Sequence, residues 1–163
     1  MKISAILAFS LLLVISGVNS ALADPFGSGA FTFDIEFVEI GDAGNVADTT
    51  GSPNPAGSVA VEYRIGKFEI SEEMIDKANA LGGLGITHAS LGANKPASSI
   101  TWFEAAQFVN WLNTSTGHSP AYKFDTGGNF QLWQSGGVGY DPTNRDRNSK
   151  ARYVLPSLDE WYK

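Results

Sequence analysis

The sequence contains no cysteine among its 163 residues. This absence excludes disulfide bonds, thiolate metal sites and a cysteine nucleophile within the chain. Charged residues are also scarce, at 17%, and acidic residues outnumber basic ones, so that the formal net charge is −6. A negative charge disfavours nucleic acids and anionic membranes as partners.

Long apolar runs are missing after the first residues of the chain. Lys2 and the free amino group precede an apolar run at residues 3–15, and small residues then lead to Ala21-Leu22-Ala23. This layout is typical of a secretory signal peptide with an A-x-A cleavage site. The alternative is an uncleaved membrane tether, but an anchor needs about 20 apolar residues. We predict a signal peptide at residues 1–23, export to the periplasm or the exterior, and no membrane association after cleavage.

The mature residues 24–163 are enough for one domain with a sizeable core. Alternation of apolar and polar residues predicts half-buried strands at residues 31–40 and 59–65. The apolar run at residues 153–155, which Pro156 ends with a turn, predicts a third, short strand. Residues 27–29 (GSG) read as a flexible lead-in to the first strand.

Capping signals predict the helices. Ser71 is a favourable N-cap for a helix that Gly82 and Gly83 end. Thr101 and Glu104 form a capping box before an apolar face that reaches Leu112.

A second capping box, Ser157 with Glu160, opens a helix close to Lys163. One turn of helix does not support itself, because nucleation is unfavourable. The expectation is therefore a domain that is incomplete at its C-terminus, with a frayed natural end as the alternative.

Residues 118–150 are long, polar and rich in glycine. Such a stretch is typical of a functional loop or of one that its own aromatic residues hold in place. We favour the second interpretation, because the stretch carries Tyr122, Phe124, Phe130 and Trp133.

Four stretches, in this order, resemble the formylglycine-generating-enzyme (sulfatase-modifying-factor) family, in a version similar to a secreted bacterial subgroup. They are residues 41–51 (GDAGNVADTTG), 63–71 (YRIGKFEIS), 96–112 (PASSITWFEAAQFVNWL) and 153–161 (YVLPSLDEW).

The resemblance implies an irregular α+β fold related to C-type lectins, with short twisted strands and two to three short helices. It implies that Trp102 and Trp111 pack in the core and that Glu160 and Trp161 lock strand to helix. The oxidases of the family use a copper-binding pair of cysteines located beyond the last of these motifs. Since the chain has no thiol, the resemblance transfers no catalytic and no cofactor-binding residue, and copper or calcium would require ligands from a C-terminal half.

Other candidate ligands are weak. His88 and His118 lie in predicted loops without an acidic partner at ligand spacing, so we expect ordinary surface histidines. Residues 141–148 space oxygen ligands somewhat like a calcium loop, but the glycine and the distal glutamate of an EF-hand are missing and two arginines oppose a cation. A further weak set of oxygen ligands comprises Asp42, Asn45 and Asp48. No metal ligand is assigned.

The sequence thus favours an exported formylglycine-generating-enzyme-like domain that lacks catalytic competence. The alternative is a non-enzymatic, C-type-lectin-like binding module for an extracellular protein or carbohydrate, with residues 118–150 as the binding surface and their aromatics stacked on sugar rings. A third reading is a degenerate fragment that does not fold. We expect residues 24–163 to be marginally stable, because half of the core would be missing.

Overall fold

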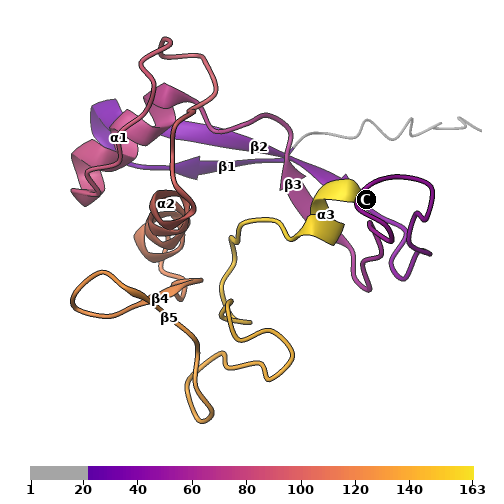
Figure 1. Cartoon of the computed structure of the whole chain (residues 1–163). Helices are drawn as coiled ribbons and strands as arrows, with labels where there is room; N and C mark the ends of the chain where they lie inside the picture. The colour runs from indigo at the N-terminus through magenta and orange to yellow at the C-terminus, as the bar shows by residue number, and fades with distance from the viewer. Residues whose placement is uncertain (1–21) are drawn as a thin grey trace, which may run out of the picture.

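The computed structural model describes residues 22–163, which form an α+β arrangement of two small antiparallel sheets and three short α-helices (Figure 1). Of the predicted signal peptide, residues 1–23, all but Leu22 and Ala23 lie outside the described residues. The elements are β1 (Leu22–Phe26), a 3₁₀ turn (Gly29–Phe31), β2 (Phe33–Ile40), β3 (Tyr63–Gly66), α1 (Glu72–Gly82), α2 (Trp102–Ser115), β4 (Lys123–Phe124), β5 (Phe130–Gln131) and α3 (Leu158–Tyr162).

The larger sheet has the order β1-β2-β3. The predicted strand at residues 31–40 is confirmed for Phe33–Ile40, where Phe33 and Ile35 are buried. β1 was not predicted, and the GSG segment is no flexible lead-in: it belongs to the turn that joins β1 to β2. In that turn Gly27 has φ +77, and a Cβ there would collide with the Phe31 carbonyl.

The second predicted strand is shorter than expected. Only Tyr63–Gly66 pairs with β2, so the prediction is wrong for residues 59–62. The backbone groups of Val59 bond to the preceding loop instead: its N–H donates to the Asn45 side chain at 3.2 Å, and its carbonyl accepts from the Gly44 N–H at 2.7 Å. Hydrogen bonds to the loop thus replace strand pairing there, although the sequence pattern of residues 59–65 is that of a strand.

All three helices with capping signals are confirmed, including α3 with its Ser157–Glu160 capping box. The Ser71 hydroxyl accepts from the Met74 N–H, and Gly83 ends α1 in the left-handed conformation. At α2, Thr101 and Glu104 form the reciprocal capping box. α2 lies below the sheet in Figure 1, where it supplies much of the core.

The tryptophans divide between core and surface. Trp111 packs against Phe33 and Phe108, as expected for core. Trp102 is 45% exposed and Trp161 is 63% exposed, so the expectation that Trp102 packs in the core is wrong. Both exposed rings border an opening in the fold.

The long loop at 118–150 contains the two-stranded β4-β5 hairpin and packs on its own aromatics. Tyr122 is buried, Phe124 contacts Phe130, and the Trp133 indole N–H donates to the Ala121 carbonyl at 3.1 Å. This confirms the packed interpretation.

Residues 153–155 do not form the predicted strand. The Tyr153 N–H donates to the Asn113 amide oxygen, and the Leu155 N–H donates to the Tyr122 hydroxyl. Side chains of α2 and of the long loop therefore satisfy these backbone amides, and no neighbouring strand is needed.

Candidate functional site

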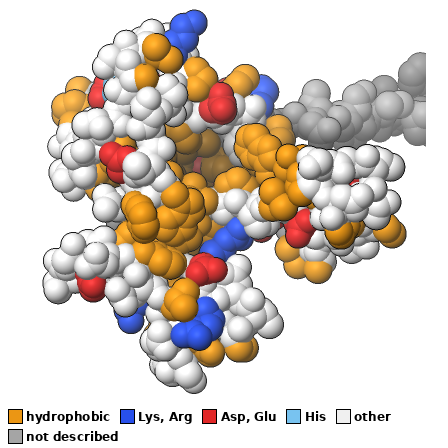
Figure 2. Space-filling view, in the orientation of Figure 1, with side chains coloured by type: hydrophobic (Ala, Val, Ile, Leu, Met, Phe, Trp, Pro, Cys, Tyr) orange, Lys and Arg blue, Asp and Glu red, His pale blue; other side chains and the backbone are white. Residues whose placement is uncertain are grey.

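A cleft of about 650 Å³ lies between the larger sheet, α2 and the segment at residues 152–161. Figure 2 shows a central hollow bordered by hydrophobic side chains. The volume lies within the range of small-molecule and peptide sites in proteins. We call this feature the apolar cleft.

Core residues form the inner walls of the apolar cleft. One face of α2 contributes Phe108, Val109 and Leu112, and β2 contributes Ile35, all of which are buried in the main hydrophobic cluster. The cluster thus continues into an open cavity. Exposed apolar area is unfavourable in water, and large apolar openings on folded domains are often interaction sites, so this cavity is the candidate site.

Large exposed side chains stand at the rim of the cleft. Phe68, which follows β3, is 66% exposed, and Trp161 and Trp102 face the same cavity from α3 and α2. Aromatic side chains of this size bury a large area when a ligand covers them. The resemblance implied core packing for Trp102, and the sequence carries no signal that separates a tryptophan at the rim of a cleft from one in the core.

One end of the cleft carries two arginines that share one carboxylate. Arg64 of β3 donates to Asp24 at 2.7 Å, Arg152 approaches the same carboxylate at 3.4 Å, and the Tyr153 hydroxyl donates to it at 2.8 Å. The bond from Arg64 is the main reason that the pKa of Asp24 lies below its usual value, although burial acts in the opposite direction. Two guanidinium groups facing one carboxylate leave a surplus of positive charge at this end.

The α3 wall of the cleft is anchored by an ion pair. Arg147 binds both carboxylate oxygens of Glu160, at 3.0 and 2.7 Å. Burial raises the pKa of Glu160, but the bonds from Arg147 and the Ser157 amide outweigh it and hold the pKa below its usual value. The Tyr63 hydroxyl also donates to the backbone carbonyl of Glu160, so α3 is bonded both to β3 and to the long loop.

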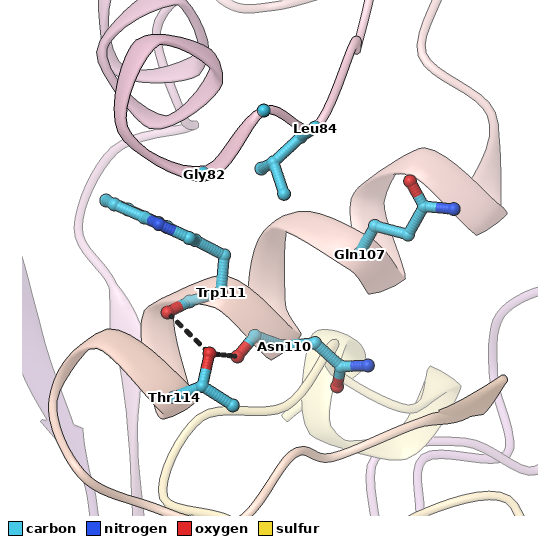
Figure 3. Close-up of a pocket in the computed structure, with 7 residues that line it drawn as sticks. Gly82, Leu84, Gln107, Asn110, Trp111 and Thr114 are labelled. Carbon is cyan, nitrogen blue, oxygen red and sulfur yellow. Dashed lines mark hydrogen bonds between the residues drawn. The ribbon is translucent and has the colours of Figure 1, made fainter.

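A second, shallower pocket of about 390 Å³ lies between the end of α1 and the outer side of α2 (Figure 3). Here Trp111 lies so close to Gly82 that a Cβ on that glycine would be 2.6 Å from the indole. The Thr114 hydroxyl bonds to carbonyls of its own helix, and Asn110 bonds to Tyr122. Because these polar groups are already satisfied, the apolar cleft is the better candidate for a binding site.

The expectation that His88 has no acidic partner is wrong. Its Nε2 lies 3.1 Å from Asp76 and its Nδ1 lies 3.3 Å from Glu72, both on α1, and the His88 side chain is only 13% exposed. Glu72 is itself 2% exposed and accepts the N–H groups of Leu91 and Gly92. The two carboxylates bind opposite sides of the imidazole. The three side chains therefore hold the loop at residues 83–95 against α1, and we call them the His88 clamp. They cannot converge on one metal ion.

This clamp predicts a stability that depends on the protonation of His88. The bond to Asp76 is the main cause that raises the pKa of His88; burial opposes it and Glu72 adds to it. Because the folded pKa is above the unfolded value of about 6.5, the contribution to stability is complete below that value and is lost as pH rises through the folded pKa.

We therefore expect the free energy of unfolding to decrease between roughly pH 6 and pH 8 in wild type, and this decrease to be largely absent in His88→Gln. Urea denaturation at both pH values measures it. His118→Gln serves as the control, since His118 contacts Thr116 and Tyr153 but no carboxylate. An identical pH dependence in wild type and His88→Gln would contradict the clamp.

Contacts within the protein involve several of the other candidate oxygen-ligand residues. Asp141 and Asp48 each accept from the N–H and hydroxyl of the threonine two residues later. Asn45 bridges Gly57 and Val59, and Lys163 donates to the Asp42 carbonyl. In residues 22–163 no group of three or more histidine, aspartate and glutamate side chains is arranged to hold a metal ion.

Comparison of the chain with protein-family models, with curated proteins and with solved structures finds no match. Within the described part of the chain, none of the helices has the length and apolar character needed to cross a membrane.

Proposed function

We propose that this chain is an exported domain of the formylglycine-generating-enzyme type, with a C-type-lectin-like fold, that acts as a binding module through its apolar cleft. The observation that carries the binding role is the cleft itself, a cavity of about 650 Å³ that opens directly onto the hydrophobic core and is bordered by exposed aromatic rings. The partner that fits this chemistry is an extracellular protein with an apolar segment.

The position of the family-like motifs supports the cleft as the binding site. Three of the four motifs contribute to its walls: residues 63–71 through β3, residues 96–112 through α2, and residues 153–161 through the segment that ends in α3. The residues on which the resemblance depends thus surround one cavity.

The proposal does not include the oxidase chemistry of the family. That chemistry depends on a copper-binding cysteine pair, and the 163 residues contain no cysteine. It also does not place a sugar on the loop at residues 118–150, because Tyr122 is buried and the Trp133 indole is held by the Ala121 carbonyl.

A small apolar probe tests the cleft directly. We expect 8-anilinonaphthalene-1-sulfonate to bind the native protein saturably, since its rings match the apolar walls and its sulfonate matches the Arg64 end. Ala105→Trp adds a bulky side chain on the cleft face of α2, and we expect it to weaken the dye by about tenfold, or 1.4 kcal/mol. Fluorescence titration measures both dissociation constants.

The matched control is Val138→Trp, at a position that is 67% exposed and outside the cleft. It should leave dye affinity unchanged. Near-UV circular dichroism confirms that each variant keeps native packing. Equal weakening by both variants, no dye binding to wild type, or selective binding of a carbohydrate on a glycan array would contradict the proposed function.

A further inference from the structure

β3 is an edge strand whose outer edge faces the apolar cleft. It is the last strand in the order β1-β2-β3, and its four residues, Tyr63–Gly66, all line the cavity. Side chains of a strand alternate between its two faces. A cavity that touches four consecutive residues therefore runs along the edge of the strand.

The pairing pattern shows which backbone groups of β3 point into the cleft. The Lys67 N–H donates to the Glu36 carbonyl at 2.8 Å, which continues the register Ile65↔Val38 and Tyr63↔Ile40. Hydrogen-bonded and non-hydrogen-bonded pairs alternate along an antiparallel ladder. Ile65 and Tyr63 consequently bond to β2, and the N–H and C=O groups of Arg64 and Gly66 point outward.

These outward groups are free within the described chain. No backbone hydrogen bond of Arg64 or Gly66 to another element is found among residues 22–163. Natural proteins usually cover or block open edges of this kind, because an open edge pairs readily with another strand. Here the edge lies beside the apolar walls of the cleft, and the neighbouring charged side chains of Arg64 and Lys67 are paired with Asp24 and Glu36.

The charged side chains of the cleft indicate which kind of ligand would fit it. Arg152 is 47% exposed at the end where it and Arg64 share Asp24. Glu160 is already neutralised by Arg147 at the α3 wall. Glu69 also lines the cleft and carries the opposite charge, so the positive surplus is confined to the end at Asp24, where an acidic residue of the ligand would complement Arg152.

We infer that the apolar cleft binds an extended segment of a separate, extracellular protein, which adds to β3 as a fourth strand. Its apolar side chains enter the cleft, and an acidic residue pairs with Arg152. This inference rests on the proposed function and specifies its partner. Backbone bonds to the strand edge provide affinity in such complexes, and alternate side chains provide specificity.

The test uses a soluble acetylated octapeptide in which valine alternates with threonine and one terminal position is aspartate. Binding of the peptide to the full exported chain is measured as displacement of the anilinonaphthalene dye. Two further peptides carry N-methyl groups on alternate backbone amides: one peptide on the odd-numbered residues and the other on the even-numbered residues. We expect one methylated register to bind about tenfold more weakly and the other to bind like the parent, because only one set of amides faces β3.

A charge comparison provides the second readout. Replacing the peptide's aspartate by lysine should weaken binding to wild type by about two- to fivefold, the range for a solvent-exposed ion pair. Arg152→Gln should remove this preference, and because the dye's sulfonate also lies toward this end of the cleft, each competition is referred to the dissociation constant of the dye measured for the same variant.

The outcomes separate the two proposals. If the dye binds but the octapeptide does not compete, or if both methylated registers bind equally, strand addition is wrong while the binding cleft stands. If neither dye nor peptide binds the native protein, the proposed function itself fails. A register-dependent loss together with the charge preference supports the inference.

Discussion

Replacing Asn113 by alanine is expected to destabilise the domain by roughly 3–5 kcal/mol. Asn113 lies at the end of α2, is fully buried, and makes four hydrogen bonds. Its amide nitrogen donates to the Val109 and Tyr153 carbonyls at 2.9 and 2.8 Å. Its oxygen accepts from the Arg152 and Tyr153 N–H groups at 2.9 and 3.0 Å.

The size of the effect comes from the groups left behind. Alanine cannot replace any of these bonds, and a buried backbone group without a partner costs about 1–3 kcal/mol. The segment at residues 152–155, which forms one wall of the cleft, would lose its main attachment to α2. Dye binding in the cleft should therefore decrease together with stability.

Urea denaturation at fixed pH measures this prediction. Asn144→Ala is the matched control, because Asn144 is exposed on the long loop and its side chain makes no hydrogen bond found among the described residues. A change of less than about 1 kcal/mol for Asn113→Ala, similar to that of the control, would show that the 152–155 segment is held by other contacts.

Replacing Phe108 by alanine is expected to cost about 3–5 kcal/mol. Phe108 is 3% exposed on the inner face of α2, packs beside Trp111, and lines the apolar cleft. Its loss would enlarge the cleft at the expense of the core. Since a domain of this size is stable by only about 5–15 kcal/mol, and the cleft leaves part of the cluster open to water, this variant should be close to unfolding at 37 °C.

Phe103→Ala provides an internal comparison on the same helix. Phe103 is 52% exposed and contacts Trp102 edge to face at 5.5 Å. Its removal should cost no more than about 1 kcal/mol. Thermal and urea denaturation of the two variants measure the difference. Equal destabilisation would mean that the two faces of α2 are not distinguished as described.

The marginal stability expected from the sequence remains a prediction. Measurement of the melting temperature with and without a cleft ligand is informative here, because a ligand that binds only the folded state raises it.

The confirmed sequence predictions concern short-range features. Ser71, Thr101 and Ser157 cap the helices that follow them, and each bonds to an amide three residues away. The alternation in β2 places Phe33 and Ile35 in the core for an equally local reason. The absence of cysteine was decisive for the chemistry without any structure.

The features that the sequence did not predict, or predicted wrongly, depend on distant partners. Val59 is bonded by Asn45 instead of a strand, and residues 153–155 are bonded by Asn113 and Tyr122 instead of a sheet. Neither the alternation at residues 59–65 nor the apolar run at residues 153–155 shows whether the bonding partner is a strand or a side chain, so the two patterns could not distinguish these situations.

The sequence by itself determined the helix starts, the main strand and the lack of thiol chemistry, because capping, alternation and composition act over a few residues. Only the tertiary structure decided the role of His88, which meets the carboxylates of α1 through the return of a loop, and the existence of the apolar cleft beside the open edge of β3. Both features require segments far apart in the chain to come together. Packing and backbone pairing between those segments stabilise them, and no single stretch of residues shows these contacts.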